Sequence, residues 1–369
     1  MRKAPSAPAR ISRRDAMLRV SASAFVLPAI TSATAILLHG CKGRRSDDQL
    51  VIYTSVDEAV AREALAVLSA GSEFVCGVNA RYDTEATKTT GLANLLRSER
   101  DAPRADVFWS SEQFHTAALA MDGVLAPLPQ SLLEGWPTAW RDPAGRWIAM
   151  NGRARVLCFD ARKVSPTAVP QLWSDFVSAA TVDGIAIADP RFGSTRGHFA
   201  AMRQVYERAQ PGLFSRLIDS LHRHQARLLP GGNSAVVDAV LRGEVTYGFT
   251  DTDDAIVAMD AGKPLGIILP RHFKEGERGG GAMMIPSTVG IVEGSKRVHC
   301  AEECVRFLIA PESEVRSAQS ALRTLPLGDG VRFGPAWGEN DPLRFDLRAA
   351  VESADATAAQ VHLALASTP

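Results

Sequence analysis

Apolar runs and amphipathic segments alternate along the chain from residue 50 onward. Residues 50–55 and 105–111 are mainly apolar stretches that end in hydroxyl side chains, and residues 74–82 alternate between apolar and polar. Residues 58–68 and 87–99, which lie between these stretches, have the spacing of amphipathic helices. Strands that alternate with helices in this order predict a parallel sheet whose two faces are covered by helices.

The middle of the chain predicts a second unit of the same kind. Residues 184–188, 225–229 and 245–249 are expected to be strands, each followed by a helix, the first of which is expected to start near His198. Two long extended segments, residues 147–157 and 282–292, join the two units. They predict a hinged pair of lobes with a cleft between them.

The expected fold class is therefore α/β, with two lobes joined by two extended crossover segments. Each lobe is expected to be a mainly parallel sheet flanked by helices. One lobe is assigned to residues 50–150 with about 282–325, and the other to residues 151–281. Residues 326–369 are expected to form C-terminal helices and a poorly patterned tail.

The first 40 residues have a different pattern. Arg13 and Arg14 precede an uncharged run of 19 residues from Val20 to Leu38, and a small residue stands before Cys41. A basic start with an apolar run is typical of an export signal, while a membrane anchor of this length is the alternative. The segment resembles a twin-arginine signal with a lipoprotein cleavage site. That resemblance implies export, a lipid on Cys41, and a linker over residues 41–49.

Charge and cysteine content narrow the function further. Residues 1–40 contain six basic residues and one acidic residue, so the rest of this formally neutral chain has a net charge of −5. An acidic body argues against a nucleic-acid binder, which needs a basic face. Cys76, Cys158, Cys300 and Cys304 are interpreted as buried thiols that act as small apolar side chains, with their disulfide state left open. A bridge between Cys300 and Cys304, one helical turn apart, would be strained.

The sharpest local feature of the body is the run Thr250-Asp251-Thr252-Asp253-Asp254, directly after a predicted strand. Three carboxylates within four residues repel one another unless they are solvated, are protonated or face a cation. Asp251 and Asp253 are therefore predicted ligands of a metal ion or of a cationic or hydroxylated solute, with Asp254 as a third candidate. The alternative is that they cap the following helix, where a carboxylate matches the positive end of the helix dipole.

Anion-binding candidates occur in two other places. Ser194 and Thr195 open a predicted helix, whose free N–H groups favour an anion, although an ordinary N-cap is the alternative. Arg153 and Arg155 alternate along one crossover segment and so face the same side. Either could clamp an anionic group or form a salt bridge, and Arg155 is the preferred candidate.

The remaining candidates lie where predicted strands end, since ligands of parallel sheets bind at the carboxyl ends of strands. Tyr53 and Trp109 are candidates for stacking on a ligand, with a place in the core as the alternative. The candidate hydroxyl groups are those of Thr54, Ser55, Ser110, Ser111 and Thr250.

Over roughly residues 50–330 the ordered set of short segments resembles the extracellular solute-binding proteins of the ferric-iron transporter type. The segments include Tyr53-Thr54-Ser55, Gly152-Arg153-Ala154-Arg155-Val156, Ala188-Asp189-Pro190, Gly193-Ser194-Thr195 and Ile285-Pro286-Ser287-Thr288-Val289. The resemblance implies a periplasmic-binding-protein fold that closes on its solute. It also implies a monomer outside the cytoplasm whose partners are an ABC permease and a cytoplasmic ATPase.

The chain departs from the pattern of this family at one position. Iron-binding members place adjacent tyrosines after the strand that corresponds to residues 245–249, where this chain has Thr250 and three aspartates. Phenolates and carboxylates are both hard oxygen ligands, but the missing tyrosines put ferric specificity in doubt.

The expected function is capture of a metal ion, or of a small anionic solute, by the substrate-binding component of an ABC importer. Ferric iron with a synergistic anion is one form of the metal hypothesis. No cofactor and no catalysis are expected, because no Ser/His/Asp set stands in a hydrolase context. The alternatives are an exported sensory or scaffold receptor that uses the same cleft, and an exported hydrolase on a similar scaffold.

Overall fold

The computed structural model describes residues 49–366 except residues 73, 84–88, 179–183, 275, 278, 321–322 and 329–340. The described residues belong to one compact unit. The expected export signal, Cys41 and nearly all of the expected linker lie outside them. Among the described residues, no helix combines the length and the apolar character needed to span a membrane.

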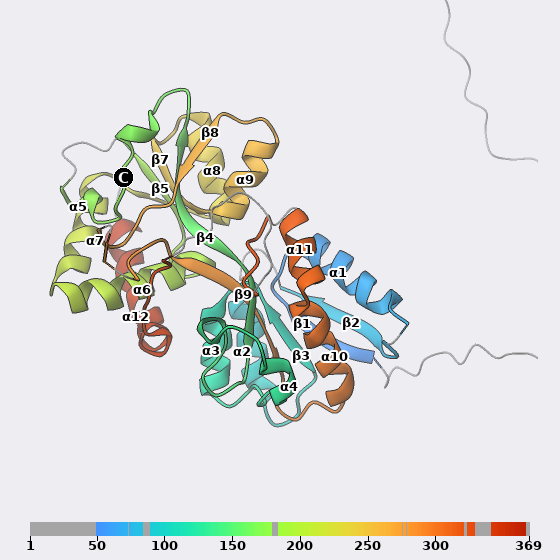
Figure 1. Ribbon diagram of the computed structural model, residues 1–369. Helices are drawn as coiled ribbons and strands as arrows, with labels where there is room; N and C mark the ends of the chain where they lie inside the picture. The colour runs from blue at the N-terminus through green and yellow to red at the C-terminus, as the bar shows by residue number, and fades with distance from the viewer. Residues whose placement is uncertain are drawn as a thin grey trace, which may run out of the picture. The chain divides into compact units, whose positions relative to one another are not determined.

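A single sheet of nine strands runs through both lobes in the order β2-β1-β3-β9-β4-β7-β5-β6, with β8 paired to β4 (Figure 1). The strands β1, β2 and β3 are parallel to one another, and so are β5, β6 and β7. The long strands β4 and β9 are antiparallel to each other and join the two parallel sets. These are the two predicted crossover segments.

The first lobe has the predicted alternation of strands and helices. Its apolar core contains Leu50 and Ile52 from β1, Val107 from β3, and Leu65 from α1. The second strand and the second helix are shorter than predicted at their N-terminal ends. The elements are β1 (Gln49–Thr54), α1 (Glu58–Ala70), β2 (Gly77–Tyr82), α2 (Thr90–Ser98), β3 (Val107–Ser110), α3 (Gln113–Met121), α4 (Gln130–Leu133) and a 3₁₀ turn (Thr138–Trp140).

The second lobe follows the crossover strand β4 (Ile148–Asp160). Its helix α7 buries Phe214, Leu217, Ile218 and Leu221, the i, i+3, i+4, i+7 stripe that packs a helix on a core. The other elements are a 3₁₀ turn (Pro166–Ala168), α5 (Asp175–Ser178), β5 (Ile185–Ala188), α6 (Gly193–Ala209), α7 (Leu213–Arg223), β6 (Arg227–Leu229), α8 (Gly232–Arg242), β7 (Tyr247–Asp251), α9 (Thr252–Asp260) and β8 (Leu265–Ile268).

Two boundaries in this lobe differ from the prediction and matter for the site. Helix α6 begins at Gly193 rather than near His198, so Ser194 and Thr195 lie in its first turn. Strand β7 continues to Asp251, because residues up to that position still pair with β4. The short strand β8 was not predicted from the sequence.

The pairing of the two crossover strands is irregular at one residue. The register between β4 and β9 (Met284–Ile291) shifts at Asn151, whose φ of 29° is in the left-handed region. Buried Glu314, on α11 (Pro311–Gln319), accepts hydrogen bonds from the backbone N–H groups of Asn151, Leu327 and Gly328. The carboxylate therefore ties the irregular residue, Asn151, to the C-terminal part of the chain.

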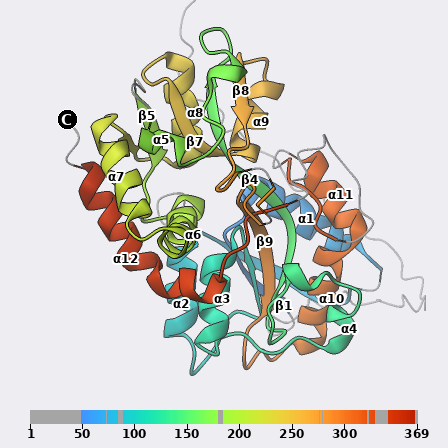
Figure 2. The ribbon, with the colours of Figure 1, turned by 60° about the vertical axis from the view of Figure 1, so that its left-hand side comes forward.

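The last helix, α12 (Leu347–Ala366), packs against α6 and α7 of the second lobe and against α3 of the first (Figure 2). The sequence predicted helices in this region but left about the last 15 residues without a clear pattern. The helix buries small residues, such as Ala350, Ala354 and Ala358, so it lacks the contrast of large apolar and charged positions that reveals an amphipathic helix.

The interpretation of all four body cysteines as buried thiols is wrong for one pair. Cys76 and Cys300 form a disulfide that joins the segment before β2 to helix α10 (Val298–Ile309). Cys158 and Cys304 are free and buried, and burial raises the pKa of each thiol to about 12. Spacing could not reveal the disulfide, because its cysteines are 224 residues apart.

Candidate functional site

A cavity of about 560 Å³ lies at the carboxyl ends of the parallel strands. The residues after β1 and β3 line it from the first lobe, and those after β5, β6 and β7 line it from the second. This is the position at which parallel α/β sheets bind ligands. The lining residues used below are Ser55, Asp57, Ser111, Arg153, Arg191, Gly193, Ser194, Thr195, Gly232, Asn233, Ser234, Asp251, Asp253 and Asp254.

The first lobe contributes a cluster of hydroxyl groups. The Ser55 hydroxyl oxygen accepts hydrogen bonds from Thr89 Oγ1 at 2.9 Å and from the backbone N–H of Ser111 at 3.0 Å. The hydroxyl oxygens of Ser55 and Ser111 are 3.3 Å apart. Of the hydroxyl residues predicted in this lobe, the structure thus brings Ser55 and Ser111 together at the cavity.

Two helices of the second lobe have their N-termini at the cavity. The first turns of α6 and α8 both line it, and neither helix has a side-chain hydrogen bond at its N-cap. Gly231 and Gly232 at the start of α8 have φ values of 101° and 77°, which glycine adopts without strain. The first N–H groups of a helix lack partners within it and sit at the positive end of its dipole, so both starts favour an anion.

On the second lobe's side of the cavity, the Asp251 carboxylate accepts hydrogen bonds from four side chains. Its Oδ1 accepts from Arg155 Nη1 at 2.6 Å, and its Oδ2 accepts from Ser194 Oγ at 2.6 Å and from Arg153 Nε at 2.9 Å. Asn233 Nδ2 also donates to Oδ2, at 2.9 Å. Burial by itself would raise the pKa of Asp251, but the two arginines outweigh it, and the pKa is lowered.

These contacts bear on both interpretations of Asp251. It occupies the N-cap position of α9, yet its side chain makes no capping hydrogen bond. Four donors already surround its two oxygens, so little coordination capacity is left for a metal ion. The main role of this carboxylate in the described structure is to neutralise Arg153 and Arg155.

Asp253 differs from Asp251 in its hydrogen bonds and in the direction of its pKa shift. One of its oxygens is buried without a hydrogen-bond partner among the described residues, and the other lies 3.6 Å from Arg153 Nε. Burial raises the pKa of Asp253 to about 6, against the attraction of Arg153 and with the repulsion of Asp251. Ligand atoms of Asp251, Asp253 and Asp254 lie within 4.8 Å of one another, close enough for one metal ion.

Arg153 connects the two lobes across the cavity. Besides its contact with Asp251, its Nη1 donates to the backbone carbonyl of Ser111 at 2.6 Å. Burial acts to lower the pKa of Arg153, but Asp253 and Asp251 outweigh it and raise the pKa. Arg155, preferred from the sequence, is fully buried behind the lining, and Arg153 is the residue that faces the cavity.

The other predicted site residues lie behind the cavity, and their polar groups form hydrogen bonds within the fold. The Tyr53 hydroxyl donates to Glu99 at 3.0 Å, and the Ser110 hydroxyl donates to the carbonyl of Glu112 at 2.7 Å. Thr54 Oγ1 accepts from the backbone N–H of Val56, and Thr250 Oγ1 donates to the carbonyl of Asn233. None of these four side chains is among the residues that line the large cavity.

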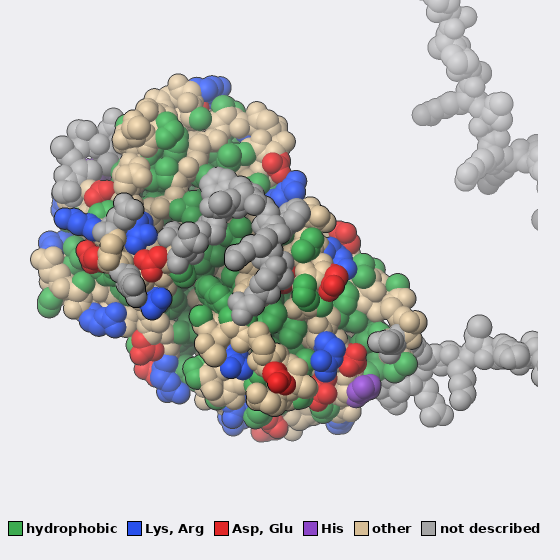
Figure 3. All heavy atoms as spheres, in the orientation of Figure 1, with side chains coloured by type: hydrophobic (Ala, Val, Ile, Leu, Met, Phe, Trp, Pro, Cys, Tyr) green, Lys and Arg blue, Asp and Glu red, His purple; other side chains and the backbone are tan. Residues whose placement is uncertain are grey.

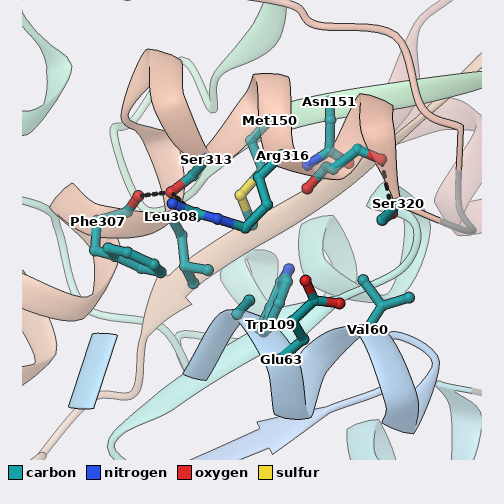
Figure 4. Close-up of a pocket in the computed structure, with 12 residues that line it drawn as sticks. Val60, Glu63, Trp109, Met150, Asn151, Phe307, Leu308, Ser313, Arg316 and Ser320 are labelled. Atoms are coloured by element: carbon teal, nitrogen blue, oxygen red, sulfur yellow. Dashed lines mark hydrogen bonds between the residues drawn. The ribbon is translucent and has the colours of Figure 1, made fainter. Parts of the chain in front are cut away.

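Trp109 lines a different and much smaller cavity of about 20 Å³, between α1, α11 and β4 (Figure 4). Its Nε1 and the Oδ1 of Asn151 are both buried, and neither has a hydrogen-bond partner in the described part of the chain. The space is enough for one water molecule. Trp109 therefore does not stack on anything in the large cavity.

Asn233 and the glycines before it are site residues that the sequence interpretation missed. The sequence pattern predicts only a helix after the strand at residues 225–229, whereas the Asn233 side chain contacts both Asp251 and Ser194. The signal was present in the sequence, because Gly231-Gly232-Asn233 follows a strand in the same way as Gly193-Ser194-Thr195 does. Among the described residues that line the cavity, none is a tyrosine or a histidine.

Comparison with known proteins identifies the class. Residues 102–327 match the family of bacterial extracellular solute-binding proteins, and this match covers more than half of the chain. The chain therefore belongs to that family. The major ferric iron-binding protein of Neisseria gonorrhoeae is 31% identical over 97 residues, which is 25% of this chain and 28% of that relative.

Solved structures show the same two-lobed fold. Iron-bound HitA from Pseudomonas aeruginosa superposes with a TM-score of 0.73 at 19% identity, covering 85% of this chain and 99% of HitA. The periplasmic binding protein AfuA from Actinobacillus pleuropneumoniae, with fructose-6-phosphate bound, gives a TM-score of 0.70 at 16% identity and covers 86% and 99%. The predicted two-lobed α/β fold is thus confirmed.

Proposed function

We propose that this protein is the substrate-binding component of an ABC importer and that it binds a small oxyanionic solute in the cavity between its lobes. The observation that supports an anion most directly is the pair of uncapped helix starts, α6 and α8, that line one cavity. Arg153 and Arg191 also line the cavity, each paired with a carboxylate: Arg153 with Asp251 and Arg191 with Asp189. The sugar phosphate bound to AfuA, which has a similar fold, supports the same ligand class.

The cavity has a second, acidic side that an inorganic anion alone would not use. Asp253 has an unpartnered oxygen there among the described residues, and its neighbour Asp254 also lines the cavity. A buried acceptor without a partner is costly, so a solute that brings a hydroxyl or amino group to Asp253 binds better than a bare anion. The proposed solute therefore combines an oxyanionic group with hydrogen-bond donors.

Over the part of the chain that the structure describes, the face of the molecule drawn in Figure 3 shows no large charged patch that would act as a second binding surface. On the face of the molecule in Figure 3, basic and acidic side chains are interspersed, without a large region of one sign among the described residues. Such a surface does not attract a polyanion such as nucleic acid.

A metal ion, including ferric iron with a synergistic anion, is the second candidate. It is favoured by the cluster of Asp251, Asp253 and Asp254 and by the names of the ferric-binding relatives. It is disfavoured by the donors that already surround Asp251, which leave two aspartates from this cluster for the metal. Hard trivalent or divalent ions prefer more oxygen ligands than that.

Binding without catalysis fits the surroundings of Ser194. Its hydroxyl donates to Asp251, which the two arginines hold ionised, and an ionised carboxylate of low pKa is a weak general base. A sensory receptor that uses the same cavity is the alternative in which no permease takes part. Loss of solute uptake on deletion of the gene, restored by the intact gene, would distinguish the importer from the sensor.

The proposal includes the part of the chain that precedes the described residues and the motion of the lobes. Residues 1–40 would direct export, and Cys41 would carry a lipid that holds the protein at the membrane. Residues 50–150 with 282–325 would close on residues 151–281 around the solute. Replacement of Cys41 by alanine should release the protein from the membrane fraction.

The helix start of α8 gives a sharp test of the anion. In Ser234→Asp a carboxylate stands in the first turn of α8, where the dipole favours it but where it repels a bound anion. Titration calorimetry with inorganic phosphate and with sugar phosphates should show at least about tenfold weaker binding, with no loss of thermal stability. Ser234→Asn is the neutral control. Equal phosphate binding by both variants, or a response to ferric salts only, would contradict the proposal.

A further inference from the structure

A line of buried polar side chains runs from the cavity into the second lobe. Arg155 Nε donates to His198 Nδ1 at 3.3 Å, His198 Nε2 lies 3.4 Å from His272 Nε2, and His272 Nδ1 lies 3.3 Å from the Tyr206 hydroxyl. All four residues are at most 1% exposed. We call this chain, Arg155–His198–His272–Tyr206, the relay.

The first member fixes the direction of every hydrogen bond in the relay. An arginine side chain only donates, so His198 Nδ1 must accept and the proton of neutral His198 must be on Nε2. That N–H points to His272 Nε2, which must therefore accept, so the proton of His272 is on Nδ1. The Tyr206 oxygen then accepts from it. The two histidines thus hold opposite tautomers.

The surroundings of the relay favour this neutral, directional state. Burial lowers the pKa of His272 to about 3, and burial with the nearby charge of Arg155 lowers that of His198. The Trp173 ring packs edge-on against His198, with ring centroids 4.8 Å apart, so the imidazole has little freedom to turn.

Arg155, the first residue of the relay, also contacts residues that line the cavity. While Nε of Arg155 is held by His198, its Nη1 contacts Asp251, Ser194 and Asn233. The remaining nitrogen, Nη2, is buried and has no partner among the described residues. The guanidinium of Arg155 therefore holds three side chains that line the cavity in place.

We propose that His198, His272 and Tyr206 are positioning residues for solute binding: His198 orients Arg155, and His272 and Tyr206 hold His198 in the one tautomer that can do so. This inference rests on the proposed function of the cavity. It assigns a role to residues from α6 and from the segment before β9 that do not line the cavity at all.

The tautomers can be tested without any ligand. Long-range ¹H–¹⁵N spectra of the full body distinguish a protonated ring nitrogen from an unprotonated one. The expected result is a proton on Nε2 of His198 and on Nδ1 of His272 at neutral pH. The same tautomer on both rings, or a charged His198, would overturn the relay.

The positioning role is tested by variants, with inorganic phosphate as the probe. Tyr206→Phe removes the final acceptor and should weaken phosphate binding about twofold to tenfold, the usual value of one hydrogen bond. Tyr247→Phe is the matched control, because Tyr247 belongs to the same core and not to the relay. Equal effects of the two changes would contradict the proposal.

A double variant separates positioning from packing. In His198→Asn, the amide oxygen replaces Nδ1 as the acceptor for Arg155 and has no tautomer to be fixed, so Tyr206→Phe should have no effect on phosphate binding in that background. His198→Gln, which places its amide farther out, should bind phosphate more weakly than His198→Asn. Additive effects would mean that the residues only pack. If wild type binds neither inorganic phosphate nor a sugar phosphate, the proposed function is wrong, and the spectra alone decide the relay.

Discussion

Arg155 on β4 and Asp251 on β7 are direct partners in the antiparallel register of the sheet, and their side chains also form an ion pair, with Nη1 2.6 Å from Oδ1. Neither side chain is more than 1% exposed. A second arginine, Arg153, contacts the same carboxylate. One buried negative charge thus supports two positive charges at the wall of the cavity.

Replacement of Asp251 by alanine should therefore destabilise the protein strongly. It leaves the fully buried Arg155 without its counter-charge and leaves Arg153 with Asp253 alone, and loss of one partner of a buried ion pair typically costs about 3–5 kcal/mol. Urea denaturation of the purified body measures this loss. Asp254→Ala, at the same helix start, is the control and should cost less than about 1 kcal/mol. A loss below that value for Asp251→Ala would mean that the ion pair is not buried in solution.

Asp253→Asn should change how stability depends on pH. The pKa of Asp253 is raised from 3.8 to about 6, so the folded state binds this proton more tightly than the unfolded state does. Its contribution to stability is therefore largest below about pH 4 and is lost as pH rises to about 6. The Asp253→Asn variant has no carboxyl group at this position, so its stability does not fall in this way as pH rises.

The quantity to compare is the free energy of unfolding of Asp253→Asn minus that of wild type. This difference should be more positive at neutral pH than at acidic pH by on the order of 2 kcal/mol. Thermal denaturation of both proteins at about pH 4 and about pH 7.5 provides the comparison. A difference between variant and wild type that is the same at both pH values would show that Asp253 titrates normally.

Gly197→Ala should disturb the contact between the two lobes. Gly197 lies on α6, and a methyl group at this position would overlap the ring of Phe114 on α3. Overpacking of this kind typically costs about 1–3 kcal/mol. The smaller side chain in Phe114→Leu should recover part of that loss in the double variant. A double-mutant cycle by denaturation measures the coupling, and purely additive losses would contradict it.

Reduction of the Cys76–Cys300 disulfide should lower the melting temperature. A bridge that closes a long loop typically contributes about 2–5 kcal/mol by restricting the unfolded chain. Calorimetry with and without a reductant measures the effect on wild type. The Cys76→Ser/Cys300→Ser variant should melt at the reduced temperature and not respond to the reductant. Cys158 and Cys304 remain in both proteins and serve as internal controls.

The sequence predicted the fold well, because periodicity and turn residues report local structure. It predicted the parallel strands of both lobes and both crossover strands, and it placed Ser55, Ser111, Ser194 and Thr195 at strand ends or helix starts. These features depend on neighbours along the chain. The short strand β8 was missed, since four residues are too few for a clear period.

The chemistry of the site was less predictable, because it depends on pairing across the sheet. The sequence showed three close aspartates but not that β4 would bring Arg153 and Arg155 to the first of them. Asp251 therefore looked like a free ligand, whereas its oxygens are occupied. The relay was equally hidden, since His198 and His272 are 74 residues apart.

The Cys76–Cys300 bridge has a mechanical consequence. Everything from β2 to β9, including the whole of the second lobe's sheet, lies inside the covalent ring that it closes. A pulling force applied at the two ends of the oxidised chain would extend only the segments outside that ring. The two cysteines are 224 positions apart in the sequence, so at about 3.4 Å per residue roughly 760 Å of contour would become extensible only after reduction.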